Sequence, residues 1–420
     1  MSARDVIPSS LAAQIDAAAR AAQAQVIAWR RDLHENPELG NREFRTAGIV
    51  AAHLRQLGLD EVRTEVAHTG VVGVLKGALP GAVVALRADM DGLPVTEEVD
   101  VSFASKARTE WNGEQVGVMH ACGHDCHVAI LMGVAQVLAG LRSQLRGTVK
   151  FIFQPAEEMP PEGEEGGAQL MIKQGALEKP VPQAIFGLHV TSRLNVGTVG
   201  YRSGPTMASS DKFKITVHGK QTHGAAPWLG VDPIVTAAQV VLGLQTVISR
   251  GTDIAREPAV VTVGMIRGGV RENIIPDEVE MRGTIRAFDE GMRDEIHERV
   301  TTLAQAVSRG SRAGCTVCID KNYPVTVNDP ALTAAMVPTL QRVAGAGKLE
   351  LVPKVTGAED FSFFQRIIPG LFFFVGVTPT DIDPAKAYSN HSPKFFVQEE
   401  GLLIGVRALA HLACDFLESR

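Results

Sequence analysis

The chain has 420 residues, 45% of them hydrophobic, so it can bury a large core, and its length favours two domains over one. With 41 basic and 47 acidic residues the net charge is -6, which leaves no basic footprint for nucleic acid. No apolar run approaches the roughly 18 residues of a membrane span and no signal peptide begins the chain, so we expect a cytoplasmic protein that meets neither nucleic acid nor membrane.

After two helical stretches that end near residue 59, the chain alternates between strands and helices. Residues 70–77 and 82–90 are β-branched runs bounded by Gly and Pro. After a helix, apolar strands follow at 148–153 and 184–190. This alternation predicts an α/β domain in which helices sandwich a mostly parallel sheet.

The densest group of metal-binding side chains is MHACGHDCH, residues 119–127. Gly123 allows the side chains of Cys122 and His124 to converge, and thiolate and imidazole are ligands that zinc and its neighbours prefer. We expect Asp125 to cap the following helix, whose dipole would favour the Cys122 thiolate. The remaining cysteine and histidines are, taken singly, more readily explained as packing residues: His120, Cys126 and His127.

Further reactive residues follow the predicted strands. Glu157 and Glu158 come after strand 148–153, and His189 closes strand 184–190. His391 follows an apolar strand at 371–377 and a loop. Because ligands collect at the carboxyl ends of strands in such sheets, these residues and the Cys-Gly-His group predict a binuclear metal centre.

The expected ligands of that centre are Cys122, His124, Glu158, His189 and His391. A water shared by two ions would lose its proton near neutrality, whereas bulk water has a pKa of about 15.7. Glu157, next to Glu158, would point away from it in an extended chain. We therefore interpret Glu157 as the general base that takes the water proton and passes it to the departing amine.

The middle of the chain has a different pattern. Residues 206–320 read as strand, helix, two strands, helix and strand, which is the βαββαβ order of a small ferredoxin-like sandwich. This segment is complete in itself, so it is predicted to be inserted between residues 1–205 and 321–420 of the first domain. Within it Cys315 and Cys318 form a CxxC, which we interpret as ordinary strand residues. The five cysteines show no disulfide framework and indicate a reducing compartment.

Six short motifs together resemble a known family: RADMDG, MHACGHD, QPAEE, GLHV, GAEDFS and NHSPKF. They are similar to the aminoacylase and carboxypeptidase family of dinuclear metallohydrolases, and most similar to its hippurate hydrolase and indole-3-acetyl-amino-acid hydrolase branch. The resemblance implies a hydrolase that cleaves the amide of small N-acyl amino acids to a carboxylate and a free amino acid. It implies two divalent ions per subunit, with manganese, zinc, nickel and cobalt all open, held by the five ligands named above, and Glu157 as base.

The resemblance also extends to the inserted segment, as a lid and dimerisation domain of a homodimer or homotetramer. GKQTHGAAP resembles the lid motif whose histidine enters the partner's active site, so His223 would polarise the scissile carbonyl. RENIIPDEVEMRGTIR resembles the segment that holds the substrate carboxylate, which implies Asn273 and Arg286.

Two other functions stay open at this point, and a third is disfavoured. A metallo-carboxypeptidase or dipeptidase would use the same chemistry. A catalytically silent member would bind an amino-acid conjugate, although such a protein need not retain all five ligands and Glu157. A thiol redox protein, which would use Cys122 with Cys126 or Cys315 with Cys318, is disfavoured because the chain offers a better use for Cys122 as a metal ligand. The acyl group is not readable, because four aromatic residues compete for the pocket: Phe361, Phe363, Phe364 and Trp228.

Overall fold

The computed structural model describes residues 9–111 and 113–420 and divides them into two compact units. The first unit runs to Gly204 and resumes over Asn328–Pro353 and Phe363–Arg420. The second unit consists of Pro205–Val327 and Lys354–Ser362. The insertion expected at 206–320 lies within the second unit.

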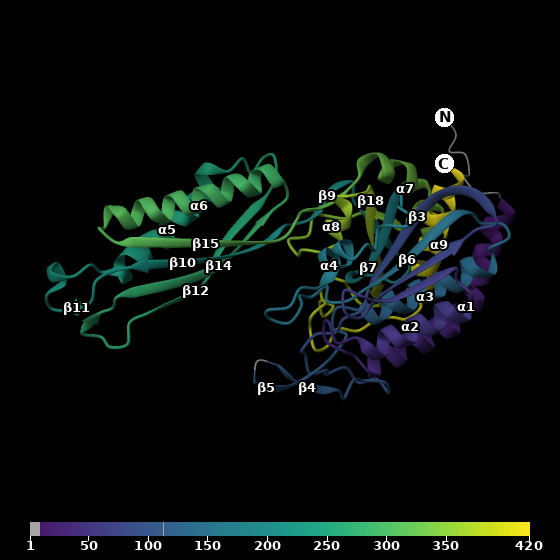
Figure 1. The fold of residues 1–420 in the computed structure, drawn as a ribbon, viewed down its shortest axis with the longest axis horizontal. Helices are drawn as coiled ribbons and strands as arrows, with labels where there is room; N and C mark the ends of the chain where they lie inside the picture. The colour runs from purple at the N-terminus through teal and green to yellow at the C-terminus, as the bar shows by residue number, and fades with distance from the viewer. Residues whose placement is uncertain (1–8, 112) are drawn as a thin grey trace. The chain divides into compact units, whose positions relative to one another are not determined.

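The first unit is built on an eight-stranded sheet with the order β1-β2-β6-β3-β7-β18-β8-β17. Its four central strands are parallel neighbours, while β1, β2 and β8 each run antiparallel to a neighbour. The predicted mostly parallel sheet is thereby confirmed (Figure 1). The strands span Glu61–Val66 (β1), Gly70–Lys76 (β2), Leu79–Asp89 (β3), Arg146–Gln154 (β6), Ala184–Asn195 (β7), Val199–Tyr201 (β8), Leu349–Leu351 (β17) and Gly370–Thr378 (β18).

Helices cover this sheet because its strands are apolar on both faces. Strand β18 is buried at every residue, as a central parallel strand should be. Helices α3 and α9 pack on the central strands, α2 on β1 and β2, and α1 lies across α3 and α9. The helices span Ser9–Glu35 (α1), Phe44–Gln56 (α2), His124–Gly140 (α3), Gly167–Lys173 (α4), Pro330–Ala344 (α7), Phe361–Gln365 (α8) and Gly401–Glu418 (α9), and a hairpin joins Arg108–Trp111 (β4) to Glu114–Gly117 (β5).

The start of α3 differs from the sequence expectation. The residue before the helix is Gly123, in the left-handed conformation at φ 96°, and no side chain caps the helix. Asp125 instead accepts hydrogen bonds at 2.8 Å from Arg30 Nε and from His34 Nδ1 of α1. The prediction of an Asp125 cap is wrong, because these two cations of α1 bind its carboxylate inside the protein.

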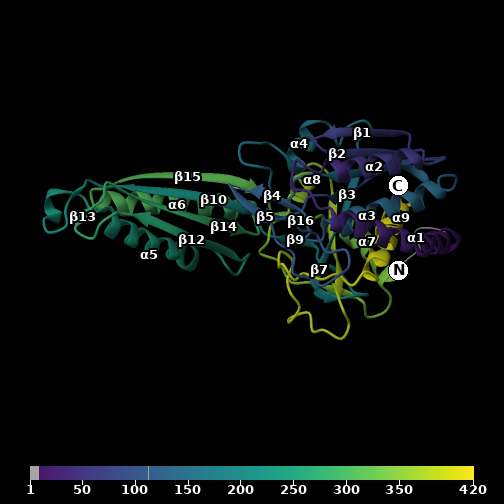
Figure 2. The ribbon, with the colours of Figure 1, turned by 90° about the horizontal axis from the view of Figure 1, so that it is seen from below.

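The second unit has the βαββαβ order. Its antiparallel sheet has the order β12-β14-β10-β15, and Figure 2 shows the four strands side by side. Helices α5 and α6 pack on this sheet (Figure 1). The core of the second unit contains buried side chains such as Ile215 and Met281. The elements span Ser210–His218 (β10), Pro233–Gly251 (α5), Ala259–Gly268 (β12), Glu278–Ala287 (β14), Glu290–Gly310 (α6) and Gly314–Tyr323 (β15), with short pieces at Gly204–Met207 (β9), Thr222–His223 (β11), Pro227–Leu229 (η1), Ile274–Ile275 (β13) and Thr326–Asn328 (β16).

Helix α5 is long and apolar enough, by length and composition alone, to cross a membrane, which the sequence analysis did not anticipate. Its buried residues include Ala237, Val240 and Leu244, which pack in the core of the second unit. Asp232 caps its first turn by accepting from the N–H groups of Ile234 and Val235. The helix therefore forms one layer of the sandwich, with 28% of its apolar window buried.

The CxxC pair lies on strand β15, where side chains alternate between the two faces of the sheet. Cys315 is half-buried and Cys318 is exposed. Residues three apart on a strand face opposite ways, so these two thiols do not form a redox or metal pair. The interpretation as ordinary strand residues agrees with this geometry.

A buried carboxylate, Asp211, ties together the elements of the second unit. It accepts hydrogen bonds from Arg293 Nε at 2.9 Å, from His297 Nε2 at 2.7 Å and from the N–H of Asn322 at 3.2 Å. Burial raises the pKa of Asp211, but the hydrogen bonds from His297 and Arg293 outweigh burial and leave that pKa below its ordinary value. The ionised form is therefore the one that stabilises the fold.

We expect Asp211→Asn to lower the stability of the protein by about 3 kcal/mol at pH 7, because it leaves buried Arg293 without its main partner. Since the folded pKa is depressed, this contribution is present above the unfolded pKa of about 3.9 and is lost as pH falls through the folded value. In thermal unfolding, the difference in Tm between wild type and variant should become smaller below about pH 4. Asp294→Asn, which breaks an exposed ion pair with Lys321, is the control. An equal loss in both variants would contradict this role of Asp211.

Candidate metal centre

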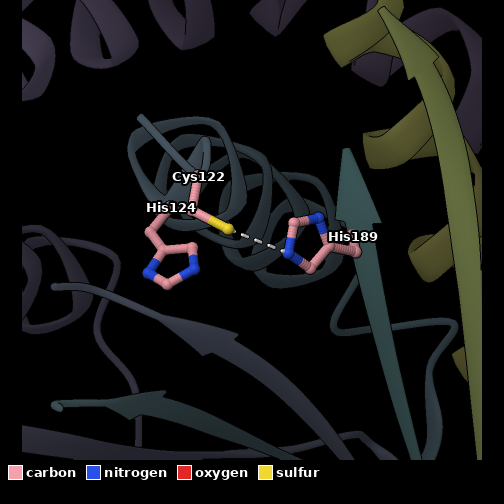
Figure 3. A group of neighbouring side chains, drawn as sticks. All are labelled: Cys122, His124 and His189. Atoms are coloured by element: carbon pink, nitrogen blue, oxygen red, sulfur yellow. Dashed lines mark hydrogen bonds between the residues drawn. The ribbon is translucent and has the colours of Figure 1, made fainter. Parts of the chain in front are cut away.

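Cys122 and His124 flank the glycine that begins helix α3. Gly123 is left-handed, and a Cβ at this position would lie 2.4 Å from a methyl carbon of Val190. Glycine is therefore required here both for its backbone conformation and for its lack of a side chain. This turn brings both side chains to the same side of the chain, toward His189 of β7 (Figure 3).

All five expected ligands lie together. The sulfur of Cys122 lies 3.3 Å from His189 Nε2 and 3.2 Å from His391 Nε2. His391 Nε2 is also 2.7 Å from Glu158 Oε1. The ligand atoms form two groups, each within 4.8 Å, that share Cys122: one with His124 and His189, the other with Glu158 and His391.

His189 does not end its strand as the sequence suggested. Strand β7 continues to Asn195, six residues farther, because it stays paired with β18. Its pairing with β3 stops at Gly187, so His189 still lies just beyond the edge of that neighbour. His189 therefore does not lie at the end of its own strand. It does lie beyond the last residue of β7 that pairs with β3, at the sheet edge where ligands are expected to collect.

In two imidazoles the Nδ1 atom is engaged by an oxygen, so the Nε2 atom is the one that faces the other expected ligands. His189 Nδ1 lies 2.7 Å from the carbonyl oxygen of Val190, which can only accept, so Nδ1 carries the proton. His124 Nδ1 lies 3.1 Å from Asp91 Oδ1. Its Nε2 is buried and has no hydrogen-bond partner among the described residues. A carboxylate or carbonyl behind the imidazole is the usual support of a metal-binding histidine, so the residues present fit divalent ions.

The site carries surplus negative charge. Burial and the carboxylates of Glu158 and Glu157 raise the pKa of the Cys122 thiol well above its ordinary value. Burial lowers the pKa of His124, but Asp89 and then Asp91 outweigh it and bring that pKa to about 10. Burial and these carboxylates therefore disfavour the Cys122 thiolate, which the sequence analysis expected the helix dipole to favour. A site of this charge attracts cations.

Glu157 faces the same site as its neighbour Glu158, contrary to the sequence expectation. The chain is not extended here: Ala156 and Met159 have φ values of 52° and 89° and enclose a turn. The turn brings one carboxylate oxygen of each glutamate and a nitrogen of His124 within 4.8 Å of one another. Glu157 is 5% exposed. The prediction that Glu157 points away from Glu158 is wrong.

Three supporting groups were missed by sequence reasoning. Asp91 holds His124 and also accepts the N–H of Glu158 at 2.8 Å. Asn390 donates to the carbonyl oxygens of Cys122 at 2.9 Å and Val190 at 3.1 Å. Asp91 lies in the RADMDG motif directly after strand 82–90, which was a visible signal for it, whereas nothing in the sequence distinguishes Asn390 from a loop residue.

The third supporting group is His127, which packing alone was thought to explain. Its Nε2 accepts the N–H of Val190 at 2.9 Å, and its Nδ1 lies 2.5 Å from Asp89 Oδ1. His127 thus fixes the backbone beside His189. His120 and Cys126 are buried and belong to none of the ligand groups found among the described residues.

In the second unit, His223 and Asn273 lie side by side. His223 pairs with Ile274, and the N–H of Gly224 donates to the carbonyl oxygen of Asn273 at 2.8 Å. His223 Nδ1 accepts the N–H of Ala225 at 3.0 Å, so its proton lies on the exposed Nε2. His223 can therefore donate a hydrogen bond to an oxygen from outside.

Arg286 lies far from His223 and Asn273 within the same unit. It lies near the far end of β14, eight residues from Glu278, which is roughly 26 Å along a strand. It is half-buried and pairs across the sheet with Val260. If His223, Asn273 and Arg286 touch one substrate, they cannot all come from one copy of this unit.

The four aromatic residues that could line the acyl pocket differ in their exposure to solvent. Phe361 and Phe364 are fully buried in the protein, whereas Trp228 is 73% exposed in η1, close along the chain to His223. Phe363 is partly buried. Trp228 is thus the aromatic side chain of this set that is most accessible to a bound molecule.

Residues 85–415 match the model of Peptidase family M20/M25/M40. The chain is 40% identical over 392 residues to thermostable carboxypeptidase 2 of Saccharolobus solfataricus, covering 93% of this chain and 95% of that protein. It is 36% identical over 400 residues to N-acetylcysteine deacetylase of Bacillus subtilis, covering 95% and 99%. It is 39% identical over 396 residues to IAA-amino acid hydrolase ILR1-like 4 of Arabidopsis thaliana, covering 93% and 86%.

A similar crystal structure is that of a dinuclear metal-binding peptidase of the M20 family from Bacillus subtilis. The two chains superpose with a TM-score of 0.80 at 34% identity, covering 96% of this chain and all of the other. Because the match covers 96% of this chain, it includes both units and is not confined to the unit that holds the expected metal ligands.

Proposed function

The chain belongs to Peptidase family M20/M25/M40, whose members are hydrolases acting on amide bonds, and we propose that it hydrolyses N-acyl amino acids with two divalent ions per subunit. The observation that carries this proposal is the convergence of five expected ligand side chains on one negatively charged site, which is buried at Cys122 and His124 and exposed at His391. They are Cys122, His124, Glu158, His189 and His391. Manganese, zinc, nickel and cobalt all accept this mixture of sulfur, nitrogen and oxygen ligands.

When bound, the two ions supply Lewis acidity toward water and toward the amide carbonyl. Glu157 is the general base in this proposal: its carboxylate takes the proton of the attacking water and passes it to the departing amine. Its position 3.9 Å from His124 Nε2 and its burial support this role, because a carboxylate held away from bulk water keeps the proton it has taken for the leaving group.

The substrate class rests on the relatives, whose names divide between deacetylases or conjugate hydrolases and carboxypeptidases. We place the present chain with the former and keep a carboxypeptidase or dipeptidase as the second candidate. Catalytic efficiency on N-acetyl, N-benzoyl and indole-acetyl amino acids, compared with dipeptides and longer peptides, separates the two. Higher efficiency on peptides would overturn the proposal, and no metal-dependent release from any substrate would indicate a silent conjugate-binding member.

The second unit acts in this proposal as a lid that forms a homodimer or homotetramer. His223 donates its Nε2 proton to the scissile carbonyl in the partner's site, and Asn273 and Arg286 hold the substrate carboxylate. The separation of Arg286 from the other two along β14 supports a site assembled from two subunits. The five cysteines are all free, which fits the proposed cytoplasmic location.

Mixing two inactive variants tests whether His223 acts across subunits. A heterodimer of His223→Ala and Glu157→Gln contains one site with both residues intact if His223 acts in trans, and none if it acts within its own subunit. Co-expression should restore about a quarter of wild-type activity by random pairing. The matched control is the mixture of Glu157→Gln with Cys122→Ala. Each of these variants damages the metal centre of its own subunit, so their heterodimer has no intact site and should restore nothing. Activity no higher than that control would exclude a role in trans.

A further inference from the structure

The turn that carries Glu157 and Glu158 is held by a buried side chain from a distant segment. Glu43 is fully buried, and its Oε1 accepts the N–H of Ala156 at 2.9 Å. Its Oε2 accepts the hydroxyl of Thr69 at 2.5 Å. Because Asp91 accepts the N–H of Glu158, acidic side chains from two separate segments hold the backbone on either side of Glu157.

This turn needs such support. Ala156 is left-handed at φ 52°, which costs a non-glycine residue about 1 kcal/mol or more. It is also fully buried, and a buried N–H without a partner costs about 1–3 kcal/mol. In the turned conformation Glu43 satisfies that N–H. The loop before Glu43 also leaves little room for movement, because a Cβ at Gly40 would lie 3.1 Å from Ala156 Cα.

Glu43 does not serve its own helix. It occupies the position before α2, where a side chain commonly caps the first turn, yet it makes no capping bond. Glu38 caps α2 instead, accepting the N–H groups of Arg45 and Thr46 at 2.9 Å each. The two glutamates of one loop are thus divided between the helix and the turn beside the metal centre.

We propose that Glu43 is a positioning residue for hydrolysis, which holds Ala156 in its left-handed conformation and so directs the carboxylates of Glu157 and Glu158 into the metal centre. Neither Glu43 nor Thr69 belongs to a ligand group, and neither has a place in the mechanism above. The turnover arm of the test rests on the proposed function, whereas its spectroscopic arm does not.

The test compares four variants in the full-length, metal-loaded protein. Glu43→Ala removes the acceptor, and Glu43→Asp keeps the carboxyl group but shortens its reach, so both should lower kcat by about 100-fold while KM stays within about threefold. Glu43→Gln keeps an acceptor for Ala156 and should regain at least about tenfold over the alanine variant. Glu38→Ala removes the same kind of bond from the same loop and should lower Tm while leaving kcat near wild type.

The second readout is the visible absorption of the cobalt-substituted protein without substrate, which reports the surroundings of the bound ion. It should change in Glu43→Ala and Glu43→Asp but not in Glu38→Ala, because Glu158 moves only in the first two. If wild type releases no amino acid, the proposed function fails and the spectra alone decide on Glu43. The proposal is overturned if Glu43→Asp has wild-type kcat and spectrum, if Glu43→Gln is as impaired as Glu43→Ala, or if Glu38→Ala loses as much kcat as Glu43→Ala.

Discussion

Replacement of Glu157 by glutamine is expected to lower kcat by about 1,000-fold, within the range of 10²–10⁴ for loss of a general base. The amide keeps the size of the side chain but cannot take a proton at neutral pH. Metal content should stay at the wild-type level, because the five expected ligands are all retained. Turnover and bound metal are measured on the same preparation.

The control for this variant is Glu165→Gln, eight residues farther on the same connecting segment. Glu165 is exposed and pairs with Lys173, so its replacement should leave kcat and metal content unchanged. Near-normal turnover of Glu157→Gln would remove Glu157 from the role of base. Loss of metal from the same variant would instead assign Glu157 to the ligands.

Replacement of Cys122 by alanine should have a comparably large effect through the metal. Cys122 is common to both groups of ligand atoms, so its sulfur contacts the ligands expected for either ion. We expect metal affinity to fall by more than about 100-fold, the upper range for residues that only support a ligand, and turnover to fall with it. Equilibrium dialysis with metal analysis measures the affinity.

Cys126→Ala is the matched control for Cys122→Ala. Cys126 is fully buried four residues farther along, in the hydrophobic core of the first unit, and belongs to none of the ligand groups found among the described residues. Its replacement should leave metal affinity unchanged. If both variants bind metal as wild type does, Cys122 is not a ligand.

The residues of the site were predictable because their chemistry is unusual for packing. Cysteine, histidine and glutamate after apolar strands indicate metal, and the sheet order brings the ends of β3, β6 and β7 to one edge. The amphipathic helices of the second unit were predictable for a similar reason, since each has a strong periodicity and α5 begins at a capping Asp232. Short polar strands such as β4 and β17 have too few residues to show any periodicity.

The errors share one physical cause, which is a partner far away in the sequence. Asp125 does not cap α3 because Arg30 and His34 bind it. Glu157 does not point away from Glu158 because Glu43 holds Ala156 in a left-handed turn. Local propensity describes neither case, because a charged or hydrogen-bonded contact inside the protein outweighs the small free energies of local backbone preference.

Titration of metal-depleted protein with manganese or zinc, while amino-acid release from an N-acyl amino acid is followed, tests the central claim most directly. Two ions held by Cys122, His124, Glu158, His189 and His391 predict activity that is absent without metal and reaches its plateau at two equivalents per chain. Full activity in the depleted protein, or a metal-saturated protein that releases no amino acid from N-acyl substrates, would contradict the account.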